Sequence, residues 1–301
     1  MLRRPQPYDG VRSGRSGTVP REPGNLRRLP VKHLQAHRIH WPPLQSGFTL
    51  AELAIVLVIV AFLLGGMMAM VSSQTDQRNW NDTQSRLEAA RDALIGFAIS
   101  NGRLPCPATC TNPPQCTTGS LGDEAPTGGA TSCTSSYGGF LPARAIGFQP
   151  IDAQGFALDA WGNRIRYALA ATLDTSVSTC SAPTLPHFNN ATKLKLNGIT
   201  CKPADLVVCS TSPATVTNMV CDANTSVTNQ KTLVAIVFST GKNGAAGGSG
   251  KNEARNLDAN ALFVSRPPDP ANATGGEFDD QVLWISVGTL YSKLIAAQVL
   301  P

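Results

Sequence analysis

Residues 47–71 read GFTLAELAIVLVIVAFLLGGMMAMV, and every position from 53 to 71 is apolar or glycine. A helix over residues 53–71 is about 28 Å long at about 1.5 Å per residue, close to the hydrocarbon thickness of a bilayer. The run contains no proline, which would interrupt a helix. Its apolar residues cover every face, whereas a helix on the surface of a soluble domain has one apolar stripe. We therefore predict a membrane-spanning helix over residues 53–71.

One acidic residue, Glu52, lies at the leading edge of this run. A carboxylate carried to the bilayer centre costs about 2.5–3.5 kcal/mol, and less near the interface. Two interpretations stay open. Glu52 lies among lipid headgroups without a specific partner, where the positive end of the helix dipole stabilises it slightly. Alternatively, a cation neutralises Glu52 inside an apolar assembly, because a buried carboxylate requires a partner.

The string SGFTLAE at residues 46–52, followed by the apolar run, resembles the processing and methylation signature of type IV prepilins and type II secretion pseudopilins. The resemblance implies that a prepilin peptidase cleaves the chain between Gly47 and Phe48 and methylates the new amine of Phe48. It also implies that Glu52 pairs with the Phe48 amine of a neighbouring subunit. The implied fold is α+β and pilin-like, with a long N-terminal membrane-spanning helix packed on a small antiparallel-sheet head that carries disulfide-bearing loops.

Residues 1–47 are rich in proline and contain nine Lys and Arg against two acids. A basic segment before a membrane helix follows the positive-inside rule. A basic arm that binds nucleic acid is the alternative, but the segment has no ordered motif, so we expect no nucleic-acid partner. An ordinary secretory signal has a shorter apolar region. We predict that residues 1–47 are a disordered, cleaved leader, that the helix anchors the protein in the bacterial inner membrane, and that the head is periplasmic.

Apolar residues continue beyond the membrane run as a stripe at helical spacing. They are Leu87, Ala90, Leu94, Phe97 and Ala98. The stripe predicts that the helix spans residues 48–101 and lays its second half on a head of residues 102–301. The Asn-Gly pair at 101–102 predicts its end. Within the head, residues 164–169, 233–238 and 282–287 have strand character, and residues 289–299 are typical of a short amphipathic helix.

All eight cysteines follow the apolar run, in loop-rich insertions at residues 103–140 and 172–230. They are Cys106, Cys110, Cys116 and Cys133 in the first insertion, and Cys180, Cys201, Cys209 and Cys221 in the second. An even number in an exported chain indicates up to four disulfides. We expect pairing within each cluster, although the connectivity stays open. The alternative is zinc at the C-x3-C pair, but no second such pair follows, and residues 48–301 contain one histidine.

Two further strings resemble elements of the major pseudopilins of type II secretion. DAWGN at residues 159–163 resembles their D-P-W-G-N hairpin, with Ala160 in place of proline, and we interpret Trp161 as a core aromatic. The glycine-rich stretch at 241–264 lacks the G-x4-G-K-[ST] pattern of a phosphate loop. It resembles their calcium-binding loop, which implies oxygen ligands for Ca²⁺ from Glu253, Asp258 and Asn260. The alternative is a solvated surface loop.

A pair of carboxylates, Asp279 and Asp280, precedes the last strand and is typical of acid–base chemistry or of a charged strand edge. We favour the strand edge, because no partner in a cleft is identifiable. The single histidine and the absence of a nucleophile-elbow string argue against an enzyme such as a tethered hydrolase.

We therefore expect a structural subunit of a type IV pilus or secretion pseudopilus, and a minor one because the head is large. Its expected partners are the prepilin peptidase/N-methyltransferase, other pilin or pseudopilin subunits and the inner membrane. An adhesin-like module that binds through its cysteine-pinned loops is the alternative.

Overall fold

The computed structural model describes residues 47–111, 115–116, 118–129, 132–180, 186–214, 219–244, 247–248 and 250–301, without the side chains of residues 66–72. The expected leader lies outside these residues, apart from Gly47, and so do the side chains at the end of the expected membrane segment, residues 66–71. Among the described residues, no helix combines the length and the apolar character needed to cross a membrane. The chain divides into two units, residues 1–57 and 58–301.

Helix α1 (Leu50–Asn101) ends beside the predicted stop signal. Gly102 adopts a left-handed conformation, with φ of 68°, and its N–H donates to the carbonyl of Ala98 at 2.8 Å. Glycine is favoured here because it carries no Cβ to strain this conformation. The predicted apolar stripe is buried except for Phe97, which is half-buried, and Ile95 is buried in addition.

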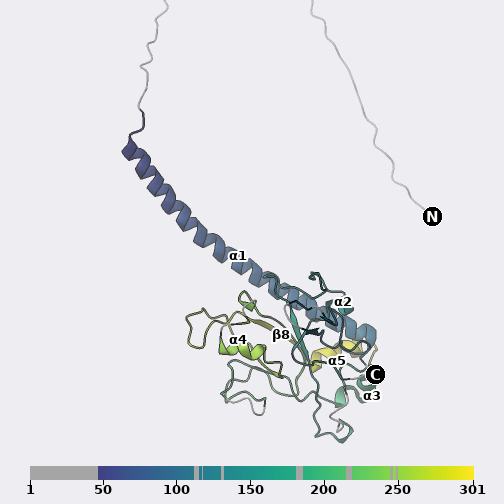
Figure 1. Cartoon of the computed structure of the whole chain (residues 1–301). Helices are drawn as coiled ribbons and strands as arrows, with labels where there is room; N and C mark the ends of the chain where they lie inside the picture. The colour runs from purple at the N-terminus through teal and green to yellow at the C-terminus, as the bar shows by residue number, and fades with distance from the viewer. Residues whose placement is uncertain are drawn as a thin grey trace, which may run out of the picture. The chain divides into compact units, whose positions relative to one another are not determined.

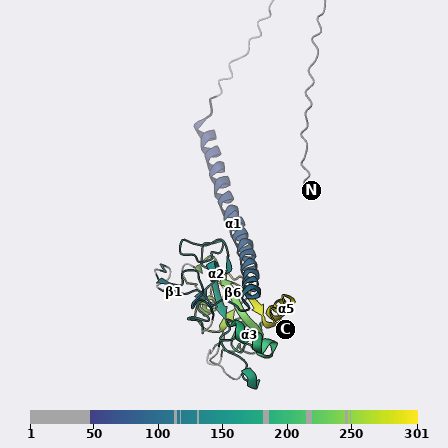
Figure 2. The ribbon, with the colours of Figure 1, turned by 90° about the vertical axis from the view of Figure 1, so that its right-hand side faces the viewer.

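The centre of the head is a four-stranded antiparallel sheet in the order β3–β4–β6–β8. Its strands are β3 (Gly139–Phe140), β4 (Arg166–Leu169), β6 (Leu233–Ser239) and β8 (Gln281–Ser286). All seven residues of β6 are buried, as expected for an apolar run that forms a central strand. Helix α5 (Val287–Ala296) follows β8 directly, and Figures 1 and 2 show it beside the C-terminal end of α1. The predicted α+β class with an antiparallel sheet is confirmed.

A second, parallel strand pair lies outside the predicted architecture. It joins β5 (Val207–Cys209) to β7 (Leu262–Val264), with α4 (Lys251–Asn256) between β6 and β7 in the chain. Phe238 of β6 contacts Phe263 of β7 edge to face, with ring centroids 5.4 Å apart. The insertion at residues 172–230 also supplies the buried core residues Phe188 and Leu194. This insertion is therefore part of the core as well as a surface loop.

The remaining elements are short, and all of them except α2 belong to the two insertions. They are β1 (Cys110–Thr111), β2 (Thr118–Gly119), α2 (Ala143–Ile146), η1 (Ser178–Cys180), α3 (Ala191–Asn197) and η2 (Gly198–Thr200). Four disulfides cross-link these insertions: Cys106–Cys133, Cys110–Cys116, Cys180–Cys201 and Cys209–Cys221. Pairing within each cluster is therefore confirmed, and these bonds leave none of the eight thiols for zinc.

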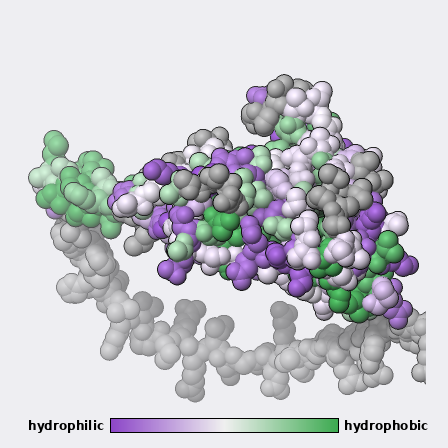
Figure 3. Space-filling model, turned by 90° about the horizontal axis from the view of Figure 1, so that it is seen from below, coloured by the Kyte–Doolittle hydropathy of each residue, from purple (hydrophilic) through white to green (hydrophobic). Residues whose placement is uncertain are grey.

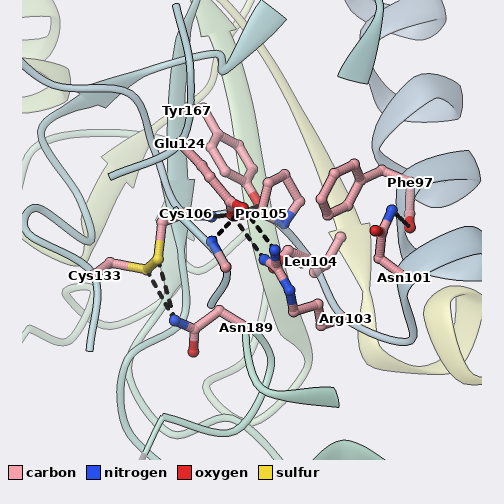
Figure 4. Close-up of polar contacts among 11 residues, drawn as sticks. Phe97, Asn101, Arg103, Leu104, Pro105, Cys106, Glu124, Cys133, Tyr167 and Asn189 are labelled. Atoms are coloured by element: carbon pink, nitrogen blue, oxygen red, sulfur yellow. Dashed lines mark hydrogen bonds and ion pairs between the residues drawn. A yellow bond between two sulfur atoms is a disulfide. The ribbon is translucent and has the colours of Figure 1, made fainter. Parts of the chain in front are cut away.

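A buried ion pair holds the first insertion against the end of α1. Figure 4 shows the guanidinium of Arg103 facing the carboxylate of Glu124, with two N–O distances of 2.7 and 2.6 Å. The same carboxylate accepts from the backbone N–H groups of Cys106 at 3.2 Å and Gly128 at 3.0 Å. Arg103 also lies over the ring of Phe97, 5.2 Å from its centroid. This contact explains why Phe97 is covered by a cation instead of the apolar core.

Candidate functional sites

Helix α1 begins with a capping box. The hydroxyl oxygen of Thr49 accepts from the backbone N–H of Glu52 at 3.2 Å. In return, the Glu52 carboxylate accepts from the backbone N–H of Thr49 at 3.0 Å and from its hydroxyl at 3.1 Å. This reciprocal pair satisfies two amides that every helix start leaves without an intrahelical partner. The carboxylate of Glu52 therefore caps the start of its own helix. The T-x-x-E spacing is typical of this role, which was not among the predictions from sequence.

The bond between Gly47 and Phe48 is accessible. Phe48 is 84% exposed, and both residues precede the first residue of α1. A Cβ added to Gly47 would meet no atom within 4 Å. Nothing among the described residues therefore requires glycine at this position.

The first residues of α1 expose an apolar surface. All of residues 50–65 are exposed, with Leu53 at 54%, Ile55 at 60% and Phe62 at 79%. Figure 3 shows a cluster of green, hydrophobic residues, whereas the visible face of the head mixes purple, white and green residues. A contiguous apolar surface of this kind marks contact with lipid or with another protein.

The loop at residues 159–163 forms hydrogen bonds with both α1 and β6. One carboxylate oxygen of Asp159 accepts from the N–H groups of Trp161 at 2.9 Å and Asn163 at 2.7 Å, and the other accepts from the Ser239 hydroxyl at 2.6 Å. Burial raises the pKa of Asp159, and these hydrogen bonds act in the opposite direction. From α1, Arg86 donates to the Asp159 carbonyl at 2.6 Å.

Trp161 packs on α1. Its ring meets that of Trp80 edge to face, with centroids 6.4 Å apart and an angle of 73° between the planes. Trp161 is half-buried, so it is a packing aromatic at the junction with α1. The structure thus differs from the prediction that Trp161 is a core aromatic.

Three carboxylates converge beside the glycine-rich loop. Oxygen atoms of Glu253, Asp279 and Asp280 lie within 4.8 Å of one another. The Glu253 carboxylate accepts from the N–H of Asp279 at 3.0 Å and from the Asn243 amide at 3.0 and 3.1 Å. Burial, followed by the neighbouring carboxylates, raises the pKa of Asp279 to about 6 and that of Asp280 to about 8.

The donor set of this cluster fits a hard divalent cation. Oδ1 of Asp279 and Oδ1 of Asn243 are buried without a hydrogen-bond partner among the described residues. An oxygen left in this state costs free energy that a bound cation would recover. Ca²⁺ prefers carboxylate and amide oxygens, six to eight of them at about 2.3–2.6 Å, and water completes the shell where protein ligands are few.

Of the three side chains that the sequence suggests as calcium ligands, the structure brings only Glu253 into this cluster. Glu253 belongs to the cluster, but Asp258 forms an ion pair with Arg255. The side-chain oxygen of Asn260 accepts from the N–H of Leu262 at 2.9 Å. Asp279 and Asp280 lie beside Glu253 instead, because the pairing of β6 with β8 brings the start of β8 beside the loop that follows β6.

Comparison with known proteins identifies one feature. A family model described as the prokaryotic N-terminal methylation motif matches residues 43–68. No curated protein and no solved structure matches the chain. The chain therefore carries the prepilin-type signature that residues 46–52 predict, and that expectation is confirmed. The match includes Gly47, Phe48 and Glu52 and ends within α1.

Proposed function

We propose that this chain is a pilin- or pseudopilin-like subunit that works by assembly through α1 and not by catalysis. The observation that carries the proposal is the N-terminal methylation motif at residues 43–68. The exposed apolar residues at the start of α1 support it, because they offer a surface to lipid before assembly and to other subunits afterwards. We assign the chain to the minor subunits because the head, residues 102–301, makes up most of its length.

In this proposal the prepilin peptidase cleaves between Gly47 and Phe48, and residues 53–71 hold the subunit in the inner membrane with its head in the periplasm. The Glu52 carboxylate is exposed and already bonded to Thr49. An incoming Phe48 amine from a second subunit would therefore join a carboxylate whose orientation is set by the capping box. A positioned partner makes a buried ion pair less costly to form.

The test of processing compares Gly47→Leu with Gly96→Leu. Both glycines have open space where a Cβ would stand. Co-expressed with a prepilin peptidase, Gly47→Leu should accumulate as precursor, whereas Gly96→Leu should be cleaved like the wild type. Mass spectrometry of the N-terminal peptide reads out both. A native chain that begins upstream of Phe48 would refute the proposal.

The test of assembly uses three variants, because Glu52 both caps α1 and offers a charge. Glu52→Val removes both roles, and Thr49→Val removes the capping hydroxyl but keeps the carboxylate. The exposed Glu88→Val is the control. If the charge is required, Glu52→Val is cleaved but absent from sheared filaments, while the other two variants assemble. Failure of Thr49→Val to assemble would instead assign the defect to the helix start.

A catalytic role finds no support from the one histidine of residues 48–301. His187 is 4% exposed, lies edge to face against Phe188 at 4.8 Å, and has its Nε2 atom 3.5 Å from the hydroxyl of Tyr291. These contacts give His187 a packing role.

We also propose that Glu253, Asp279 and Asp280 hold a calcium ion that stabilises the glycine-rich loop.

A further inference from the structure

A pocket of about 540 Å³ opens beside the sheet. Its walls come from the end of β3, from residues 152–166 and from the turn after β6. The lining residues that matter below are Phe140, Asp152, Asn163, Arg164, Arg166 and Thr240. Pockets of about 300–1,000 Å³ are the usual size for small-molecule sites.

Arg166 is the unusual member of this lining. It lies opposite Phe140 in β3 and opposite Phe238 in β6, so the three side chains share one face of the sheet. Its guanidinium stacks on the ring of Phe140, 4.9 Å from the centroid. Burial lowers the pKa of Arg166, and the charge of Asp280 acts in the opposite direction.

The charge of Arg166 has no direct counter-ion in the part of the chain that the structure describes. Arg166 forms no ion pair there, whereas eight pairs join other residues. A guanidinium carries five N–H donors and cannot lose its charge in a protein. Arg166 is half-buried, and even partial burial of such a group without an acceptor is costly. Because Arg166 lines the pocket, an acceptor that binds there would meet this requirement.

Arg164 provides an internal comparison. It lines the same pocket and also stacks on an aromatic ring, 4.6 Å from the centroid of Phe156. However, its Nε atom lies 2.6 Å from the carboxylate of Asp152, so this pair is neutral. Arg166 is therefore the lining cation without an ion pair in the part of the chain that the structure describes, and its charge favours a ligand with a negative charge.

We propose that this pocket binds the carboxylate of an acidic monosaccharide. A guanidinium stacked on a ring keeps its N–H edge free, and this edge matches the two oxygens of a carboxylate. Thr240 and Asn163 line the same space, and the Thr240 hydroxyl offers a polar group to a sugar hydroxyl, whereas the Asn163 amide nitrogen already donates to the Gly241 carbonyl at 2.6 Å. This binding activity goes beyond the proposed assembly function and does not depend on it.

The test measures binding of glucuronate to the full-length chain in detergent micelles by calorimetry. Glucose is the uncharged control, and inorganic phosphate and acetylated dipeptides are alternative anions. We expect glucuronate to bind at least tenfold more tightly than glucose. Equal affinity for the two sugars, or no binding, would overturn the proposal. Preference for phosphate or a dipeptide over glucuronate would overturn the assignment to a sugar acid.

Three variants locate the interaction. Arg166→Gln should lose at least tenfold in affinity for glucuronate, and Arg166→Lys, which keeps the charge without the planar fork, should be intermediate. Lys293→Gln removes an exposed cation of α5 that does not line the pocket, and it should alter affinity less than threefold. Because the charge of Arg166 lacks a direct counter-ion in the wild type, the Arg166→Gln variant should also unfold at the same temperature as wild type or higher. A variant that fails to fold, or that binds like wild type, would refute the assignment.

Discussion

Replacing Glu124 by glutamine tests whether the buried ion pair supports the junction between α1 and the first insertion. The side chains of Glu124 and Arg103 are 8% and 10% exposed, and two short contacts join them. Glutamine keeps the shape of the side chain and one acceptor oxygen, but it leaves the guanidinium buried without a counter-charge. Breaking a buried pair from one side costs about 3–5 kcal/mol. We expect a loss of about 3 kcal/mol at pH 7, because the remaining oxygen still accepts one hydrogen bond.

Urea unfolding of the processed chain in micelles, followed by tryptophan fluorescence, measures this loss. Glu88→Gln is the matched control, since Glu88 is exposed on α1 and accepts from the side chain of Gln84. A surface change of this kind stays within about 0.5 kcal/mol. A loss below about 1 kcal/mol for Glu124→Gln would refute the structural role of the pair.

The same variant carries a signature in its pH dependence. Burial raises the pKa of Glu124, but Arg103 and the amides of Gly128 and Cys106 together bring it below 4.5. A carboxyl with a lowered pKa in the folded state stabilises the fold above its unfolded pKa, and this stability is lost as the pH falls through the folded value. The difference between wild type and Glu124→Gln should therefore shrink below pH 4.5. A difference that is constant down to pH 3 would contradict this explanation.

Three further predictions concern the other sites. Thr49→Val should cost the start of α1 about 1 kcal/mol, seen as faster amide exchange over residues 50–53; unchanged exchange would show that the capping box is unimportant. Burial lowers the pKa of His187 to about 4, so its NMR signal should not titrate between pH 6 and 7, and its contribution to stability should be complete above pH 6.5 and fall toward pH 4. Calcium at 100 times its dissociation constant should stabilise the fold by about 2.7 kcal/mol, and Glu253→Gln should abolish this effect; equal stabilisation of the variant would place the ion elsewhere.

Local patterns in the sequence predicted the features that depend on neighbouring residues. The continuous apolar run at 233–238 became β6, and the Asn-Gly pair marked the end of α1, because burial and backbone conformation there follow from a few adjacent side chains. The motif at residues 46–52 was readable for the same reason. The capping box depends on equally local residues. Its T-x-x-E spacing was readable in the sequence, but Glu52 was interpreted only by its charge.

Features that depend on distant pairing were not readable. Asp279 and Asp280 join Glu253 only because β6 pairs with β8. Likewise, β5 and β7 are separated by more than fifty positions, and no periodicity announces that they pair in parallel. Only the three-dimensional structure shows that Arg164 has an ion-pair partner and that Arg166 has none among the described residues. In the sequence, Arg164 and Arg166 are equivalent members of an alternating strand.

The hydrogen bonds of the loop at residues 159–163 with α1 and β6 have a mechanical consequence. Arg86 and Thr83 of α1 bond the loop from one side, while Ser239 and Gly241 bond it from the other. Tension applied along this part of α1 would pass through these bonds into the central strand of the sheet, bypassing the cysteine-linked insertions.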